Sequence, residues 1–363
     1  MSRRFVDRRG PCVQQGLHAR AAALAFHVVA SASTLLLAAC AGAHDEQSVL
    51  RGLTMGSTWS VTVVRSGGVA TGELERLQRD VQAQLDDVDT RLSTWSETSE
   101  LSRFNAAAAG TGVELSPLAW AVLDAARAAH AETSGAFDPT VAPLVRAYGF
   151  GGGEIGEPPT AEEIEALRAC VGIGHLIERR PKLDKDVDGV QLDFSGIAPG
   201  FAVDRLCELL DARNFSSYLV DVGGEIRARG ERSGGGPWRL AVEDPNAGDE
   251  RRAYLVVALS DGALATSGDY RNNRLVDGVA VPHLFDPRSL APIASRVTSS
   301  SVLAPTAARA DALATALAVL GGEAALEIAP RLGIEVFVLE RAEDGSLIEF
   351  ASPGFTRARI ESP

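Results

Sequence analysis

The sequence predicts an α+β protein in which helices pack against largely antiparallel sheets. Leucine and valine recur at spacings of three and four over residues 73–92, which is typical of an amphipathic helix. Residues 334–339 and 347–350 are rich in β-branched and aromatic side chains and flank Asp344-Gly345, so they predict a closing hairpin. Residues 218–229 and 238–243 predict two more strands, joined as a hairpin by a glycine-rich loop. Because hairpins connect antiparallel strands, the predicted sheets are largely antiparallel.

The N-terminal segment is expected to be a lipoprotein signal peptide covering residues 1–39. Five arginines precede an apolar run at residues 21–37, which leads into Leu-Ala-Ala-Cys with Cys40 as the lipidated residue. A transmembrane helix is the alternative, but the run contains His27 and falls short of the roughly 20 apolar residues that a span needs. We therefore expect a membrane-anchored protein on the extracytoplasmic, periplasmic side.

Composition and length narrow the remaining choices. Of the 363 residues, 45% are hydrophobic, which is enough for a sizeable core. Loss of the signal segment removes five arginines and one aspartate, so the formal net charge of −13 becomes −17. Such an acidic chain is a poor nucleic-acid binder, which excludes that class of partner. After a polar tether at 40–53, we expect a single domain at 54–363. A division of this domain into two lobes, at about 54–150 and 160–351, is the further possibility.

Local signals place several element boundaries along that domain. Residues 54–64 alternate threonine with β-branched residues and predict a strand that starts near Met55. Ser116 followed by proline predicts a helix start, and Gly135 its end. The glycine- and proline-rich residues 149–159 predict a loop. Thr160 begins a capping box that opens another helix.

The stretch at residues 193–204 predicts a strand-to-helix corner. An apolar run ends at Asp193, and the chain then passes Gly196 and Gly200, which permit close approach of the backbone. The N-terminal N–H groups of the following helix are expected to offer an anion site. Alone, this is a weak functional signal.

Asp311 and Thr315 strengthen the functional signal given by residues 193–204. They stand four residues apart in an alanine- and leucine-rich segment, so they share one face of a predicted helix. A carboxylate and a hydroxyl on such a face suit a hard cation.

Several short motifs follow one another along the chain. They are Met55-Gly-Ser-Thr-Trp, Gly135-Ala-Phe-Asp-Pro-Thr, Asp193-Phe-Ser-Gly, Asp221-Val-Gly-Gly-Glu, Ala265-Thr-Ser-Gly-Asp-Tyr, His283-Leu-Phe-Asp-Pro and the segment with Asp311 and Thr315. In this order, the motifs resemble those of the ApbE family of flavin transferases. The resemblance runs from about residue 54 to 351. It implies a duplicated, T-fold-related architecture of sheets and helices with a cofactor cleft between lobes.

The resemblance also implies roles for particular residues. Flavin-nucleotide contacts are expected from Met55, Trp95, Ala136, Phe137, Asp138 and Asp193, and a Mg²⁺ ion from Asp311, Thr315 and the main-chain carbonyl of Gly196. His283 is implied as the base or proton shuttle, with Asp193 holding substrate. From the residues alone, Met55 suits core packing, Asp138 suits a cap for the next turn, and a lone histidine is usually structural.

The implied reaction is the Mg²⁺-dependent transfer of FMN from FAD to a threonine or serine hydroxyl of an acceptor redox protein, with release of AMP. Two alternatives stay open: an FAD pyrophosphatase, and a non-enzymatic FAD-binding or scavenging lipoprotein. The chain departs from the family pattern at Pro199, where relatives commonly have lysine, and this departure keeps the two alternative functions open. The sequence lacks a Walker lysine loop, a zinc spacing, a Ser-His-Asp elbow and a dinucleotide-binding glycine motif, which argues against an ATPase, a serine hydrolase or a Rossmann dehydrogenase.

Overall fold

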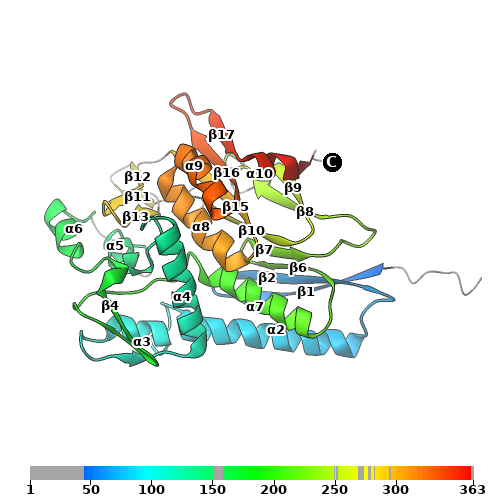
Figure 1. Ribbon diagram of the computed structural model, residues 1–363, viewed down its shortest axis with the longest axis horizontal. Coiled ribbons are helices and arrows are strands. Elements are labelled where there is room, and N and C mark those ends of the chain that lie inside the picture. Colours follow the sequence, from blue (N-terminus) through cyan, green and yellow to red (C-terminus); the bar gives the residue numbers. More distant parts are fainter. Residues whose placement is uncertain are drawn as a thin grey trace, which may run out of the picture. The chain divides into compact units, whose positions relative to one another are not determined.

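A large antiparallel sheet carries the fold of the computed structural model (Figure 1). The structure describes residues 45–150, 158–248, 250, 252–268, 274–276, 279–281, 283–293 and 296–360. The sheet has eight strands in the order β1-β2-β6-β7-β10-β15-β16-β17. These are β1 (Asp45–Thr54), β2 (Ser57–Ser66), β6 (Ser217–Val222), β7 (Glu225–Arg229), β10 (Gly262–Gly268), β15 (Val297–Ala304), β16 (Glu335–Arg341) and β17 (Leu347–Ala351).

Most helices lie between β2 and β6 or between β15 and β16 in the chain. The helices are α2 (Thr71–Leu92), α3 (Glu100–Ala106), α4 (Pro117–Glu132), α5 (Ala142–Ala147), α6 (Ala161–Leu167), α7 (Ala198–Ala212), α8 (Ala307–Leu320), α9 (Gly322–Leu332) and α10 (Pro353–Ala358), with 3-10 turns η1 (Pro139–Val141) and η2 (Ile173–His175). The smaller strands are β3 (Val113–Glu114), β4 (Leu176–Arg179), β5 (Lys182–Lys185), β8 (Trp238–Glu243), β9 (Ala253–Leu259), β11 (Arg274–Val276), β12 (Val279–Val281), β13 (Phe285–Asp286), β14 (Ala291–Pro292) and β18 (Arg359–Ile360).

The sheet contains the same unit twice, which agrees with the predicted duplication. In the first half, β1 and β2 are followed by helices and then by β6 and β7; in the second, β10 and β15 are followed by α8 and α9 and then by β16 and β17. The two halves join where β7 pairs with β10 over Gly262–Leu264. Mixed helices and antiparallel sheets were the predicted fold class, and this prediction is confirmed.

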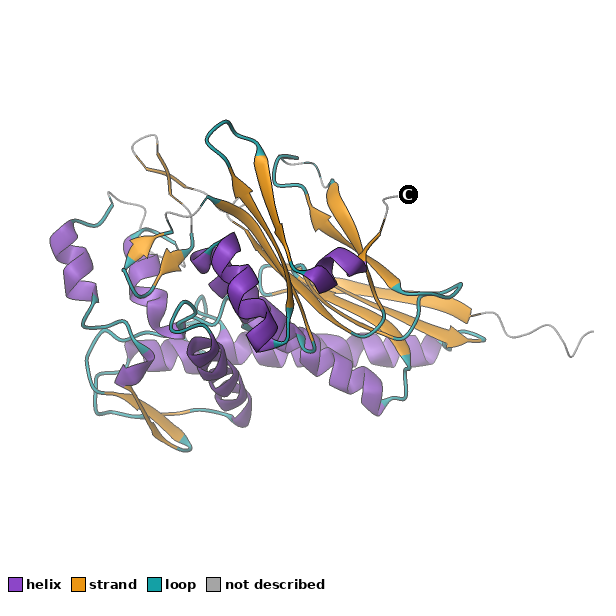
Figure 2. Ribbon diagram, turned by 45° about the horizontal axis from the view of Figure 1, so that its top comes forward, coloured by secondary structure: helices purple, strands orange, loops and turns teal. Residues whose placement is uncertain are grey.

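Helices cover one face of the sheet and a small sheet covers part of the other (Figure 2). The helix layer contains α2, α7, α8 and α9. Helix α2 buries the apolar stripe that its spacing predicted, and α8 is buried on almost every side, as expected for a helix rich in alanine and leucine. On the opposite face, β8, β9 and α10 pack on the main sheet through a second apolar cluster that includes Trp238 and Phe355.

Several local predictions are confirmed. The helix expected at residues 73–92 is α2, the Ser116–Pro117 signal opens α4, and Thr160 forms a complete capping box with Glu163. The predicted closing hairpin is β16–β17.

Other local predictions are wrong. Residues 45–53 of the tether expected at 40–53 belong to strand β1. Residues 218–229 are two strands, β6 and β7, that turn at Gly223 and Gly224, and β8 pairs with β9 instead of with them. Both glycines have positive φ, as two-residue hairpin turns require. The Gly-Gly pair within an apolar segment was therefore a signal that could have predicted this turn.

The main sheet also joins strands from both of the lobes considered, because β2 pairs with β6. Residues 45–363 form one compact unit. The predicted signal peptide with Cys40, most of the predicted loop at 149–159, and the last two residues of the motif at 265–270 lie outside the described residues. Within the described residues, no helix combines the length and apolar character needed to cross a bilayer.

Candidate functional site

The crossing of α7 and α8 forms the centre of the candidate site. A Cβ atom at Gly200 would overlap the carbonyl of Ala307 and would lie 2.8 Å from Cβ of Asp311, so only glycine permits this approach. The N–H of Gly200 donates a hydrogen bond of 3.0 Å to Oδ2 of Asp311. The two helices named in the sequence analysis are therefore in direct contact.

Thr315, one turn after Asp311, lies beside Ser267 and Gly196. Its Oγ1 is 3.0 Å from Oγ of Ser267, and a Cβ at Gly196 would lie 3.0 Å from the same Oγ1. Ser267 reaches this place because β10 runs on past its pairing with β7. The structure thus brings the predicted residues Gly196, Asp311 and Thr315 together and adds Ser267. Sequence reasoning assigned no role to Ser267, although its Ala-Thr-Ser segment belongs to the resembling motifs.

The Asp311 carboxylate is buried, with 4% of its surface exposed. Burial raises its pKa well above the ordinary value, and the nearby charge of Glu225 raises it further. Burial likewise raises the pKa of Glu225 to about 7, with a smaller contribution from Asp221. Glu225 is only partly exposed, and its negative charge acts on the buried Asp311, so a bound cation would relieve the cost of charging both groups.

The first turn of α7 does not offer the free N–H groups that we expected. The N–H groups of Ile197 and Ala198 both donate to the carbonyl of Phe194, at 3.0 and 2.8 Å, and Pro199 has none. Gly200 donates to Asp311, so the three N–H groups at the start of α7 already have acceptors. The anion-binding expectation is therefore wrong for this turn.

These donors fit Mg²⁺. A carboxylate, hydroxyls and a main-chain carbonyl are hard oxygen ligands, and Mg²⁺ commonly takes only one or two carboxylates and completes its shell with water and phosphate oxygens. Among the residues that the structure describes, no group of three or more histidine, cysteine or acidic side chains could hold a metal. A transition-metal site of that kind is accordingly not found there, and the α7–α8 crossing is the candidate cation site.

The carboxylate of Asp204, in α7, holds the start of α8 in place. Both oxygens of Asp204 accept hydrogen bonds from the first N–H groups of α8, those of Ala307 and Ala308, at 2.9 Å each. Arg227 of β7 pairs with the same carboxylate at 2.6 Å. A carboxylate at a helix N-terminus satisfies unpaired donors and complements the helix dipole. Asp204 therefore fixes where α8 starts and hence where Asp311 lies.

Asp193 lies beside the segment with Ala136, Phe137 and Asp138. Its N–H donates to the carbonyl of Pro139 at 2.7 Å, and its Oδ1 accepts a 2.7 Å hydrogen bond from Ser195. Phe137 Cε2 would be 3.4 Å from a Cβ at Gly196. The structure consequently brings two of the predicted flavin-contacting segments to the cation site. The run before Asp193 is not the predicted strand, since residues 190–193 have no regular secondary structure.

Asp138 has the capping role that the sequence left open. It is buried, and its Oδ1 accepts hydrogen bonds from the N–H and the hydroxyl of Thr140, at 2.8 and 2.6 Å. Its Oδ2 accepts from the N–H of Ile173 at 3.2 Å and lies 3.3 Å from Nδ1 of His130. Burial alone would raise the pKa of Asp138, but the contacts with His130 and Thr140 lower it. The hydrogen bond to Asp138 in turn raises the pKa of His130. Contact between Asp138 and the nucleotide remains a prediction.

His283 lies in a small apolar cluster beside these segments. Its ring centroid is 6.4 Å from that of Phe150, and the following Phe285 is buried against Tyr148. A Cβ at Gly135 would lie 3.7 Å from Cγ of Arg288, which places the His283–Arg288 segment against the start of the Ala136–Asp138 segment. The role of His283 as a base stays a prediction.

Met55 and Trp95 differ in their surroundings. Met55 is the first residue of the two-residue turn between β1 and β2, with φ of 46°, an uncommon value for a side-chain-bearing residue. It also packs partly on the core, as its residue type suggested. Trp95 is 78% exposed, so its ring face is accessible for stacking on a planar ligand. Neither contact with a flavin is tested by the geometry.

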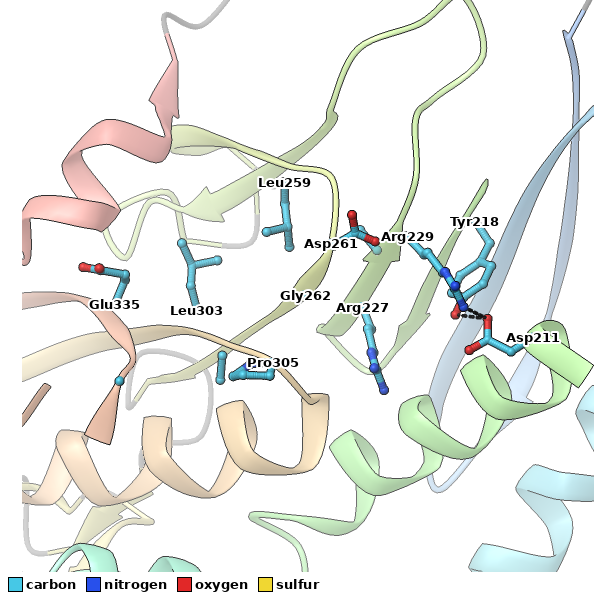
Figure 3. Close-up of a pocket in the computed structure, with 13 residues that line it drawn as sticks. Asp211, Tyr218, Arg227, Arg229, Leu259, Asp261, Gly262, Leu303, Pro305 and Glu335 are labelled. Carbon is cyan, nitrogen blue, oxygen red and sulfur yellow. Dashed lines mark hydrogen bonds and ion pairs between the residues drawn. The ribbon is translucent and has the colours of Figure 1, made fainter. Parts of the chain in front are cut away.

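A pocket of about 560 Å³ lies at the other end of α7 (Figure 3). Asp211 in its wall is eleven residues from Gly200, or about 16 Å along the helix. Arg229 pairs with Asp211 at 2.6 Å, and Tyr218 donates to the same carboxylate at 2.8 Å. Because Arg227 is also paired, the charges of both arginines in the wall are already matched. The pocket is separate from the candidate site.

Comparisons with known proteins bear on the family of this chain. The model of the ApbE family matches residues 55–338. The chain is 39% identical to the FAD:protein FMN transferase of Vibrio cholerae over 329 residues, covering 90% of this chain and 97% of the relative. It is 37% identical to the FAD:protein FMN transferase of Haemophilus influenzae over 333 residues, covering 90% and 95%.

Solved structures give the same answer. The flavin transferase ApbE from Vibrio cholerae superposes with a TM-score of 0.77 at 36% identity, covering 86% of this chain and 99% of that one. The apo flavinyl transferase ApbE from Pseudomonas stutzeri superposes with a TM-score of 0.77 at 38% identity, covering 86% and 97%. Sequence motifs, duplicated sheet and site geometry thus lead to one assignment: the chain belongs to the ApbE family.

Proposed function

We propose that this flavin transferase moves FMN from FAD to a threonine or serine hydroxyl of an acceptor protein in a Mg²⁺-dependent reaction that releases AMP. The α7–α8 crossing carries the proposal. Here the buried Asp311 carboxylate contacts α7 at Gly200, and one turn later the hydroxyls of Thr315 and Ser267 lie beside Gly196, next to the Ala136–Asp138 segment. Such an oxygen cluster suits a cation that binds phosphate.

In this reaction the acceptor oxygen bonds to the FMN-side phosphorus, and the bond from that phosphorus to the bridging oxygen breaks. The hydroxyl proton passes to His283, and AMP leaves with the bridging oxygen. Bound Mg²⁺ would neutralise charge that develops on the phosphate oxygens. Asp311, Thr315 and the Gly196 carbonyl would hold the ion, and Ser267 would orient the Thr315 hydroxyl.

Other residues would bind and orient the flavin nucleotide. The exposed Trp95 and the turn residue Met55 offer apolar surface for the isoalloxazine ring. Phe137 offers apolar surface beside Gly196, and Asp193 would orient the substrate next to the cation. Lipid attachment at Cys40 would hold the enzyme at a membrane on the periplasmic side, where membrane redox proteins are the proposed acceptors.

The test is incubation of the purified protein with FAD and Mg²⁺, with and without an acceptor peptide, followed by mass spectrometry. Transfer predicts a peptide heavier by one FMN group and an equal amount of AMP. Free FMN and AMP with an unmodified peptide would instead identify a pyrophosphatase. Recovery of intact FAD under all conditions would identify a carrier and reject the proposal.

A further inference from the structure

The backbone that leads to Asp193 has an unusual set of hydrogen-bond partners. Strand β5 ends at Lys185, and residues 190–193 have no regular secondary structure. The side chains of Val190 and Leu192 are nonetheless fully buried. Backbone N–H and C=O groups inside a protein need partners, and no strand supplies them here.

Asn105 supplies two of those partners. Its Nδ2 donates to the carbonyl of Leu192 at 2.9 Å, and its Oδ1 accepts from the N–H of Leu192 at 2.7 Å. This is the paired exchange that two residues make across an antiparallel ladder, with a side-chain amide in place of a peptide group. Asn105 lies in the last turn of α3, eighty-seven residues away in the chain.

Lys185 supplies a third hydrogen-bond partner for the backbone before Asp193. Its side chain is 1% exposed, and Nζ donates to the carbonyls of Val190, Phe104 and Asn105 at 2.7, 3.0 and 3.2 Å. All three N–H donors of the ammonium group therefore have an acceptor. Two of the acceptors are carbonyls at the C-terminal end of α3, where a positive charge is favourable. The buried lysine thus ties α3 to the segment before Asp193.

The other end of α3 is fixed to the loop that carries Trp95. The hydroxyls of Ser99 and Ser102 donate to the carbonyl of Ser93 at 2.6 and 3.2 Å. The hydroxyl of Ser93 accepts from the N–H of Trp95 at 3.2 Å. One helix of seven residues consequently contacts both the exposed Trp95 loop and the backbone before Asp193.

We propose that Asn105 and Lys185 are positioning residues of the flavin-transfer site. They fix the Leu192 backbone so that Asp193 and the Gly196 carbonyl face the cation site, and α3 holds this segment at a set distance from Trp95. The inference rests on the proposed function, because it assigns Asp193 and Gly196 to that reaction. Neither Asn105 nor Lys185 touches the reacting atoms.

The experiment compares Asn105→Leu, which keeps the side-chain size and removes both hydrogen bonds, with the wild-type chain. Ser352→Ala is the matched control, since Ser352 is also buried and accepts from the Val336 N–H at 2.9 Å, near Glu335 in the wall of the separate pocket. Three quantities are measured: kcat for FMN transfer, the Mg²⁺ concentration that gives half-maximal rate, and amide hydrogen exchange of residues 190–196.

We expect Asn105→Leu to lower kcat by about 100-fold, the size of effect that small displacements in an active site produce. We also expect it to need more Mg²⁺ and to exchange faster at residues 190–196. Ser352→Ala should change none of the three, although it too loses a buried hydrogen bond. A wild-type kcat and Mg²⁺ requirement in Asn105→Leu would overturn the proposal.

The exchange measurement separates this inference from the proposed function. If the wild-type protein transfers no FMN, the function fails, but protection of residues 190–196 by Mg²⁺ still tests the positioning. Protection that is present in the wild type and lost in Asn105→Leu supports it, and equal protection in both rejects it. Should Asn105→Leu not fold, Lys185→Met gives the same comparison, because it removes the charge and all three donors of Lys185.

Discussion

Replacing Asp311 with asparagine would test the cation site most directly. The amide has nearly the same shape as the carboxylate, and its oxygen can still accept the hydrogen bond that Gly200 donates at 3.0 Å. The substitution therefore removes charge while keeping the α7–α8 contact. Because burial raises the pKa of Asp311, the charged form is disfavoured in the folded protein, and the metal-free Asp311→Asn variant should be at least as stable as the wild type.

The magnitude follows from binding linkage. A ligand at 100 times its dissociation constant stabilises the folded state by about 2.7 kcal/mol. The entropy of unfolding for a unit of roughly 320 residues is about 0.67 kcal/mol/K, so saturating Mg²⁺ should raise the wild-type Tm by about 4 °C. Asp311→Asn should show almost no Mg²⁺-dependent shift. Its rate of FMN transfer should fall by about 100-fold or more, as when one charge-stabilising group is removed from an active site.

The assay is thermal unfolding in EDTA and in rising Mg²⁺ concentration, paired with the transfer rate at each concentration. Asp344→Asn is the control, because Asp344 makes the same type of carboxylate contact, with Ser346, in the exposed turn between β16 and β17. It should keep both the Mg²⁺ shift and the rate. A full Mg²⁺ shift together with a wild-type rate in Asp311→Asn would refute the assignment of Asp311 to the cation.

Three further predictions concern other parts of the chain. His283→Ala should still bind FAD but transfer FMN about 10²–10⁴-fold more slowly, as expected for a lost general base; a wild-type rate in a stopped-time transfer assay would exclude that role. Cys40→Ser should move the protein from the membrane to the soluble fraction on cell fractionation with its specific activity unchanged, and retention in the membrane would indicate an uncleaved helix. His130→Ala should lose more stability near about pH 6 than near about pH 8.5 in urea unfolding. Its contact with Asp138 raises the pKa of His130 above 6.5, so the stabilisation is complete below that pH and declines as pH rises through the folded-state pKa; an equal loss at both values would contradict this.

The parts of the fold that sequence predicted are those with local causes. The apolar spacing of α2, the capping box at Thr160 and the closing hairpin at β16–β17 each depend on residues within a few positions of one another. Strand β1 was missed because its exposed side chains read as a polar tether, whereas its ten residues are held by pairing with β2. The strand that pairs with β8 could not be predicted from the sequence either, since strand pairing is decided by packing between segments far apart in the chain.

The candidate site divides in the same way. Asp311 and Thr315 were singled out because helical spacing placed them on one face, and in the structure Asp311 contacts Gly200 while Thr315 lies beside Gly196. Their role as metal ligands stays a prediction. Ser267, Asn105 and Lys185 were missed because their partners lie between five and eighty-seven residues away, in segments that no local pattern connects. Side chains that satisfy a distant backbone leave no periodic signal in a single sequence.

Pro199 shows how the local structure and the chemistry constrain each other. It stands in the first turn of α7, where proline is well suited because its missing N–H has no partner to lose there. The neighbouring N–H groups donate to Phe194 and to Asp311, so this turn provides neither a lysine charge nor a free donor for a diphosphate. The negative charge of FAD must then be met by other groups, and the oxygen cluster of Asp311, Thr315 and Gly196 can provide a cation at this position. The proposed function therefore predicts a stricter Mg²⁺ requirement for this chain than for a variant with a lysine at residue 199.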